Sequence, residues 1–131
     1  MSTSQSIPTD PTFLTPRQVG QCGEDIATDH LRDLGYLIQN RNVRTRHGEI
    51  DIVALDGDTL VFAEVKTRRS HVMGPGIMAV TPQKVARIRR LAGWYLMEHS
   101  PPHRDIRIDA LDILLRSGHA PLVDHYRGVQ S

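Results

Sequence analysis

Residues 48–66 have the sequence GEIDIVALDGDTLVFAEVK, and this stretch decides the fold that we expect. Two runs rich in apolar residues, 49–55 and 59–68, flank Asp56-Gly57-Asp58, a triplet typical of tight hairpin turns. The pattern therefore predicts two neighbouring strands. Apolar residues occupy consecutive positions in the second run, which is typical of a strand buried on both faces. We expect that strand to lie in the middle of a sheet.

Both predicted strands carry acidic residues among their apolar ones. Residues i and i+2 of a strand point to the same face, so Glu64 should lie beside Lys66, and Glu49 beside Asp51. Burying a carboxylate in such strands is costly unless a cation or a partner compensates its charge. Acids and a lysine on adjacent strands can hold a divalent cation next to a positioned water, which is the equipment for hydrolysing a phosphodiester. The alternative is a half-exposed hairpin whose charges face the solvent.

The rest of the sequence predicts an α/β domain with the order α-β-β-β-α-β and a possible last strand, built on a mixed sheet flanked by helices. The spacing of apolar residues indicates a first helix over 17–34, which ends at Gly35. Gly20 and Gly23 within it indicate close backbone packing or a later start. Thr81-Pro82 begins a second helix that runs to about His99. The remaining strands are expected over 36–43, 107–115 and 122–126.

The composition fits one soluble globular domain. The chain has 131 residues, enough for a single core, and no apolar run approaches the ~20 residues that span a membrane. We find no secretory signal, and the lone Cys22 excludes an internal disulfide and a cysteine-rich zinc site. Together these features favour a cytoplasmic protein without a membrane partner. Residues 1–16, rich in Ser, Thr and Pro, are expected to form a flexible tail before one domain over 17–128.

Two further acids are candidates for the same site. Glu24 borders the apolar face of the first predicted helix, where it could lean over the sheet as a third metal ligand. It could instead be an acid favoured by the positive N-terminal end of the helix dipole, a role for which Asp25 is equally suited. Glu49 could bind a metal directly, support a ligand, or pair with an arginine of the 44–46 turn.

Basic residues are concentrated in the middle of the chain. Residues 41–90 hold ten Lys or Arg against five Asp or Glu, although the net charge of the whole chain is only +1. The basic residues of the second predicted helix could be an ordinary solvated face. Combined with cations of the strands and turns, they could form a phosphate-binding surface that positions a duplex without identifying its sequence. Its candidate members are Arg41, Arg44, Arg46, Arg68, Arg69, Lys84, Arg87 and Arg90.

The histidine and aromatic side chains indicate less about function than the acidic and basic ones. The seven histidines show no spacing typical of a zinc site. His47 and His71 lie near the predicted site and could contact a substrate. We assign Tyr36, Trp94 and Tyr95 to the core rather than to base-stacking platforms.

The spacing Asp51-x(12)-Glu64-x-Lys66, after a helix that bears a glutamate, resembles the PD-(D/E)xK nuclease superfamily. A longer set of motifs is more specific, covers about residues 17–128, and is similar to the YraN family of small bacterial proteins. Two positions differ from the patterns: Met78 stands where that family has an acidic residue, and Ile50 stands where the superfamily motif has proline. The matching motifs, in order, are Gly23-Glu24, Gly35-Tyr36, Asn40-Arg41-Asn42, Gly48-Glu49-Ile50-Asp51, the 62–68 segment, Ala79-Val80 and Lys84.

The resemblance implies a restriction-endonuclease-like core and a Mg²⁺- or Mn²⁺-dependent phosphodiesterase. Its substrate would be DNA, including branched or junction DNA, because the family is similar in fold to Holliday-junction resolvases. Lys66 would orient the attacking water, and Glu49 would bind a second ion or brace the arginine turn. The implied metal ligands are Glu24, Asp51, Glu64 and the backbone carbonyl of Val65.

Two alternatives to that function stay open. The same fold could serve as a catalytically silent module that binds nucleic acid, or that forms a homodimer through an exposed sheet edge. An RNA-processing nuclease would need the same residues as a DNA nuclease. Nothing in the sequence separates these substrates.

Overall fold

The computed structural model describes residues 13–69 and 81–129. Our expectations for residues 1–12 and for His71, Met78 and Ala79-Val80 therefore lie outside the described residues. The predicted mixed α/β architecture is confirmed, because two helices flank one five-stranded sheet. The elements in chain order are α1 (Pro16–Asp33), β1 (Leu37–Thr45), β2 (Gly48–Asp56), β3 (Thr59–Arg68), α2 (Pro82–Glu98), β4 (Asp105–Arg116) and β5 (His119–Tyr126).

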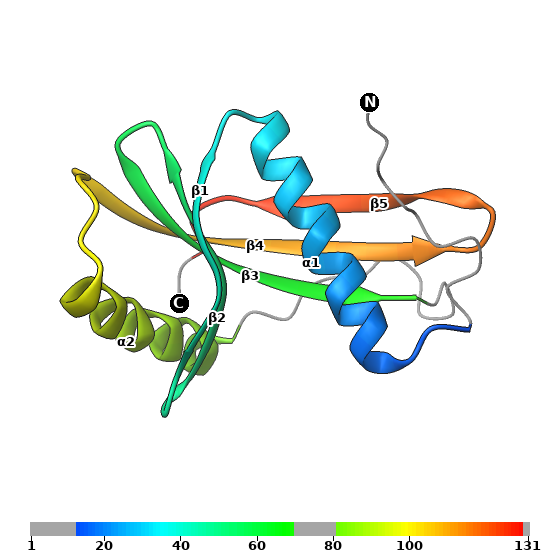
Figure 1. Ribbon diagram of the computed structural model, residues 1–131, viewed down its shortest axis with the longest axis horizontal. Coiled ribbons are helices and arrows are strands. Elements are labelled where there is room, and N and C mark those ends of the chain that lie inside the picture. The colour runs from blue at the N-terminus through cyan, green and yellow to red at the C-terminus, as the bar shows by residue number, and fades with distance from the viewer. Residues whose placement is uncertain (1–12, 70–80, 130–131) are drawn as a thin grey trace.

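The sheet has the strand order β1-β2-β3-β4-β5, and every neighbouring pair is antiparallel except the parallel pair β3–β4. β3 is the central strand, as its apolar sequence predicts. α1 covers one face, where its Ala27 and Leu31 join a core with Ala63 of β3. α2 covers the opposite face, where Ile88 joins a second core with Phe62 (Figure 1). Neither of these two helices is long and apolar enough to cross a membrane.

Both helices begin at side-chain caps that the sequence predicts or allows. Thr15 accepts a hydrogen bond from the backbone N–H of Gln18 at 3.1 Å, and the Gln18 side chain accepts one from the backbone N–H of Thr15 at 2.9 Å. This pair is a capping box. Thr81 caps α2 by accepting from the backbone N–H of Lys84 at 3.1 Å. Gly35 follows α1 with φ of +93°, in the left-handed region that ends helices.

α1 lies very close to β3 at Gly23. A Cβ atom added to Gly23 would be 1.8 Å from Oγ1 of Thr67, whereas one added to Gly20 would have no neighbour within 4 Å. Of the two glycines that could indicate close packing, only Gly23 therefore does so. The contact brings the part of α1 that carries Glu24 against the end of β3.

β2 and β3 separate partway along their length, at a point that we call the fork. Their antiparallel ladder ends at the Ile52–Ala63 pair. Beyond it, β2 stays paired with β1 and β3 stays paired with β4. Figure 1 shows the β1–β2 hairpin running downward while β3 continues alongside β4. No described strand pairs with the facing edges of residues 48–51 and 64–68.

A buried ionic cluster, which no local pattern of the sequence indicates, joins β4 to the rest of the fold. The Asp109 carboxylate is fully buried and accepts hydrogen bonds from Arg107 at 2.7 and 3.1 Å and from His125 Nε2 at 2.8 Å. Tyr36 and the backbone N–H of Gly128 also donate to it, at 3.3 and 3.1 Å. Burial alone would raise the pKa of Asp109, but the hydrogen bonds from His125, Arg107 and Gly128 outweigh that effect and hold the pKa well below its usual range.

We predict that Gly23→Ala destabilises the protein and that Gly20→Ala does not. The new methyl group at position 23 would overlap Thr67 and force α1 away from β3, at a cost of about 1–3 kcal/mol. Gly20→Ala adds a better helix former in open space and should stabilise the fold by up to about 1 kcal/mol. Urea unfolding of both variants checks this. Equal effects of the two substitutions would contradict the close approach at Gly23.

We also predict that Asp109→Asn lowers the free energy of unfolding at pH 7 by about 3–5 kcal/mol, because Arg107 loses its buried partner. The pKa of Asp109 is lowered in the folded state, so its charge stabilises the fold above the unfolded-state pKa of about 4. That stability is lost as the pH falls below about 4, and the gap between variant and wild type should narrow there. Asp105→Asn, at an exposed position of the same strand, is the control. Denaturant unfolding at several pH values gives the measurement, and a loss below 1 kcal/mol at pH 7 would contradict the prediction.

Candidate active site

Asp51 lies at the fork, where the β2–β3 ladder stops. Its Oδ2 accepts a hydrogen bond from the backbone N–H of Val65 at 2.8 Å, so a side chain occupies the position that a strand partner would take. The N–H and C=O groups of one strand residue point to the same edge of the strand. The carbonyl oxygen of Val65 therefore also faces the fork, on the side of Asp51.

Glu64 and Lys66 share the α2 face of the sheet, as their spacing predicts. Phe62 belongs to the core under α2, and Ala63 belongs to the core under α1, which fixes the alternation of side chains along β3. Nη2 of Arg87 on α2 lies 3.5 Å from Oε1 of Glu64. Lys66 is exposed. The Glu64 carboxylate and the Lys66 ammonium group thus lie on the α2 side of the fork.

Glu24 comes from α1 and is about nine-tenths buried. Its Oε1 accepts hydrogen bonds from Nδ2 of Asn42 at 2.8 Å and from Nη2 of Arg41 at 3.2 Å. Arg41 also contacts Asp25 at 2.6 Å. Asn42 has φ of +52°, a left-handed conformation that is uncommon for residues other than glycine. The backbone of β1 is therefore adapted to hold the Glu24 carboxylate.

Burial raises the pKa of Asp51 to about 6, well above that of an ordinary carboxyl group. The hydrogen bond from Val65 opposes this rise, whereas the nearby negative charges of Glu24, Glu64 and Glu49 add to it. Glu49 itself is exposed. Asp51 is thus a carboxylate whose charge the surrounding side chains do not compensate. A strongly perturbed acid next to other acids is typical of sites that bind a cation or exchange protons.

The oxygen atoms at the fork fit a hard divalent cation. Mg²⁺ prefers oxygen ligands and commonly uses one or two carboxylates while it keeps several waters. Asp51, Glu64 and the carbonyl of Val65 offer such a set. Arg41 and Asn42 both donate to Oε1 of Glu24, so Oε2 is the oxygen through which Glu24 could join the set. In the described part of the chain, no group of three or more His, Cys, Asp and Glu side chains already converges on one point as a metal site would require.

Arg41 has an unsatisfied atom beside this site. Its Nε is buried and has no hydrogen-bond partner within residues 13–69 and 81–129. Because a buried donor without a partner is costly, a water or a substrate oxygen is expected to accept from it. Arg41 therefore joins the acids at the fork instead of projecting into solvent.

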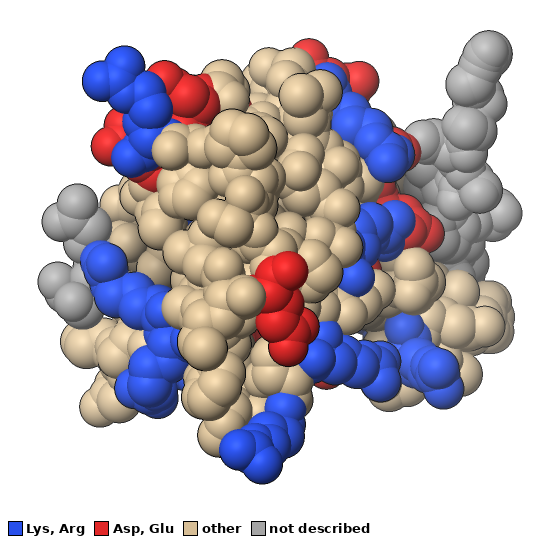
Figure 2. Space-filling view, turned by 60° about the vertical axis from the view of Figure 1, so that its left-hand side comes forward, with Lys and Arg blue, Asp and Glu red and all other residues tan. Residues whose placement is uncertain are grey.

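The eight basic residues predicted to bind phosphate do not all project outward. Arg87 forms an ion pair with Glu64. Arg68 forms one with Asp112, in which Nε lies 3.4 Å from Oδ1. Arg69 donates to the backbone carbonyl of Leu14. On the face that Figure 2 shows, Lys and Arg side chains line the lower part and also occur at the upper left and right, while acidic groups lie at the upper edge, at the right and at the centre. The exposed members are Arg44, Arg46, Arg69, Lys84, Arg87 and Arg90.

The expectation that all three large aromatic residues are buried is wrong for Trp94. Tyr36 and Tyr95 are buried, at 2% and 3% exposure, but Trp94 is 43% exposed. Its ring stacks on His47, with centroids 4.9 Å apart and an interplanar angle of 20°. His47 therefore lies at the tip of the β1–β2 hairpin, against α2. The apolar spacing of α2 could not reveal this, because Trp94 lies beside the buried stripe of the helix.

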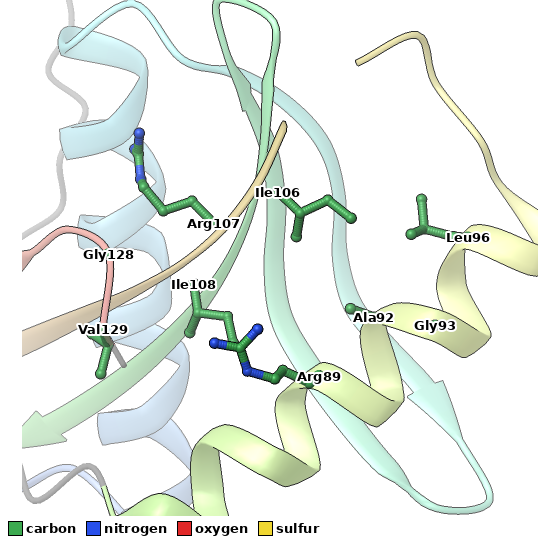
Figure 3. A pocket seen from close by; sticks show the side chains of 9 residues that line it. All are labelled: Arg89, Ala92, Gly93, Leu96, Ile106, Arg107, Ile108, Gly128 and Val129. Atoms are coloured by element: carbon green, nitrogen blue, oxygen red, sulfur yellow. The ribbon is translucent and has the colours of Figure 1, made fainter. Parts of the chain in front are cut away.

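A pocket of about 340 Å³ lies elsewhere, between α2, β4 and the segment around Val129. Figure 3 shows Arg89 reaching toward Ile108 across this pocket, while the guanidinium of Arg107 points away from it. No acidic side chain lines this pocket among the described residues, and none of the predicted catalytic residues contributes to it. The fork is therefore the stronger candidate for an active site.

The fold and the site together define a class: a small α/β protein with a mixed five-stranded sheet flanked by helices, whose central strands separate around a group of carboxylates. The sequence model of the family described as "Uncharacterised protein family UPF0102" matches residues 23–113. The chain belongs to the UPF0102 family, which is the YraN family that its motifs indicate.

Several relatives support this assignment over nearly their whole length. UPF0102 proteins from Nocardia farcinica and Streptomyces griseus are 45% and 48% identical to this chain, over 111 and 112 residues. The alignments cover 85% of this chain in both cases, and 87% and 94% of those proteins. A UPF0102 protein from a Parafrankia species is 49% identical over 112 residues, covering 86% of this chain and 95% of its own.

We predict that Asp51→Asn stabilises the protein at pH 8 in the presence of EDTA. The raised pKa means that the folded state holds a proton on Asp51 more tightly than the unfolded state between about pH 4 and 6. Stability is therefore lost as the pH rises through this range, and the charged form costs about 2–3 kcal/mol above it. Asparagine avoids that cost and can still accept from Val65.

Thermal unfolding at pH 4 and at pH 8 measures this effect. The melting temperature of Asp51→Asn should exceed that of the wild type at pH 8, and the two should approach each other at pH 4. The exposed Asp58→Asn controls for the loss of one negative charge. A difference that does not change with pH would show that the charge of Asp51 is not destabilising.

Proposed function

We propose that this protein is a metal-dependent nuclease with a restriction-endonuclease-like core of the PD-(D/E)xK type, and that it acts on DNA. One observation carries the proposal. The β2–β3 ladder stops at Ile52–Ala63, the Asp51 carboxylate accepts from the backbone N–H of Val65 beyond that point, and Glu64 extends from the same stretch of β3 toward Arg87 of α2. Lys66 lies on the same face as Glu64, next to the fork.

Asp51 and Glu64 would hold Mg²⁺ or Mn²⁺ together with the carbonyl oxygen of Val65. The bound ion would make a coordinated water more acidic and would neutralise charge on the scissile phosphate. The chain itself supplies the remaining functions. Lys66 would donate a hydrogen bond to the attacking water or to a phosphate oxygen, where negative charge develops. Arg87, now 3.5 Å from Glu64, is placed to exchange that carboxylate for a phosphate oxygen.

Residues around the fork would orient the substrate. Arg41 holds Glu24 in place through an ion pair at 3.2 Å. Exposed cations of the β1–β2 hairpin and of α2 would contact phosphates without identifying the base sequence. Their position supports this role, because the β1–β2 hairpin and α2 flank the fork. The cations in question are Arg44, Arg46, Lys84 and Arg90.

A second candidate is a protein that binds nucleic acid without cutting it. The ion pairs Arg87–Glu64 and Arg41–Glu24 favour this reading of the site, because they compensate carboxylates with the chain's own cations. Metal-dependent thermal stabilisation separates the two functions. A nuclease should gain melting temperature with Mg²⁺ or Mn²⁺. A binding module should gain it only with nucleic acid, in a salt-dependent way.

We predict Mn²⁺- or Mg²⁺-dependent cleavage that Asp51→Ala and Lys66→Ala each reduce at least about 100-fold. The assay incubates purified protein with linear, flapped and branched DNA and with RNA, with either metal or with EDTA. Asp124→Ala, an exposed acid on the edge strand β5, is the matched control and should cleave at the wild-type rate.

Undiminished cleavage by Asp51→Ala or Lys66→Ala would exclude the fork as the active site. Cleavage of RNA alone would replace DNA as the substrate while leaving the site in place. Absence of cleavage, combined with salt-sensitive binding, would favour the second candidate.

A further inference from the structure

A second recess lies beside the exposed ring of Trp94, and we call it the ring pocket. It has a volume of about 230 Å³ and lies between the tip of the β1–β2 hairpin and the C-terminal half of α2. Its lining includes Arg44 and Arg46, which the proposed function uses as phosphate contacts, and stacked rings to which that function gives no role. The principal ones are Arg44, Arg46, His47, Trp94, Tyr95 and His99.

The walls of the ring pocket are firmly held. The hydroxyl of Tyr95 donates to Oδ1 of Asn40 at 2.6 Å, which ties α2 to β1. His99 stacks on Tyr95, with centroids 4.7 Å apart and an interplanar angle of 26°. At the hairpin tip, a Cβ atom added to Gly48 would be 3.4 Å from Cδ1 of Leu91, so the tip lies close to α2. Tyr95 and His99 are thus held in place before a ligand arrives, which lowers the entropic cost of binding one.

The charge around the ring pocket suits an anion with an aromatic part. Arg44 and Arg46 are exposed, and neither forms an ion pair with an acid of the described residues. Glu98 is the acid at the pocket, and its side chain is 81% exposed, 4.0 Å from His99. A nucleotide presents both features, because its base stacks on aromatic rings and its phosphate pairs with arginine.

The ring pocket also lies on a path to the fork. Arg87, Arg90 and Trp94 are spaced by three, four and seven residues, so they lie along one side of α2. Arg87 contacts Glu64 at the fork, and Trp94 is about 10 Å further along the helix axis. His47, in the turn just before β2, is four residues from Asp51, or roughly 13 Å along an extended chain. A nucleic-acid strand covers that distance with about four nucleotides at helical spacing.

We propose that the ring pocket binds an unpaired base of a single-stranded segment, which stacks on the exposed ring of Trp94 while Arg44 and Arg46 contact its phosphates. The inference rests on the proposed function, and it names the substrate class: nucleic acid with a single-stranded portion a few nucleotides from the scissile phosphate. A base inside an intact duplex cannot stack on Trp94, because its faces are covered by its neighbours.

The test measures binding in EDTA, so that cutting does not interfere. Trp94 is the only tryptophan of the chain, and its fluorescence reports directly on the ring pocket. A single-stranded twelve-nucleotide DNA should quench it, and a blunt duplex of the same length should not. Fluorescence anisotropy of labelled strands should show that Trp94→Ala weakens single-strand binding roughly 5- to 100-fold. Duplex affinity should stay unchanged, and Trp94→Phe should recover part of the loss.

Met97→Ala is the matched control, because Met97 is 79% exposed on the same helix and does not line the ring pocket. Circular dichroism checks that each variant folds. Arg44→Ala and Arg46→Ala should each reduce the slope of log affinity against log salt by about 1. Parallel arms with single-stranded RNA and with a mononucleotide identify the ligand. Tighter binding of single-stranded DNA or RNA than of the mononucleotide supports the proposal, and the tighter of the two strands identifies the ligand.

Three outcomes would overturn the ring pocket proposal: no quenching by single strands, equal losses on single strand and duplex, or equally tight binding of the mononucleotide. These are separable from failure of the proposed nuclease. Binding that depends on Trp94 without any metal-dependent cleavage would remove the nuclease and keep the ring pocket. Cleavage that depends on Asp51, together with single-strand binding that Trp94→Ala does not weaken, would keep the nuclease and remove the ring pocket.

Discussion

The hydrogen bond from the backbone of Val65 to the carboxylate of Asp51 is the contact on which the site depends. A continuous β2–β3 ladder would satisfy these backbone groups with each other and leave no opening in the sheet. The ladder stops at Ile52–Ala63 instead, and the Asp51 side chain takes the place of a backbone acceptor. A partly buried N–H of β3 is thereby satisfied by a carboxylate oxygen of β2. The same contact therefore keeps the sheet intact and opens the fork.

The fully buried Asp109 and the half-buried Asp51 show how differently this protein treats carboxylates. Asp109 receives hydrogen bonds from Arg107, His125, Tyr36 and Gly128, and its pKa is lowered. Asp51 receives one backbone hydrogen bond among several acids, and its pKa is raised. The first arrangement is complete without a ligand and serves the fold. The second lacks positive charge, which is why we infer that a cation belongs there.

α2 connects the features that concern function. Its buried side packs against the sheet through Ile88 and Tyr95, while its outer side presents cations and Trp94. The helix begins at Thr81 and reaches the fork through Arg87, and its later turns support the hairpin tip. A rigid element thus fixes the spacing between the proposed active site and the proposed ring pocket. That spacing would set which part of a substrate can reach the fork.

The sequence by itself determined the elements of this protein, because their signals are local. The Thr caps, the Asp-Gly-Asp turn and the periods of apolar residues depend only on neighbours along the chain, and the same holds for the shared face of Glu64 and Lys66. Only the tertiary structure decided which distant groups meet. Arg41 and Asn42 hold Glu24, Arg107 and His125 hold Asp109, and His47 stacks on an exposed Trp94. Such contacts depend on the twist and separation of the strands, which no local pattern specifies.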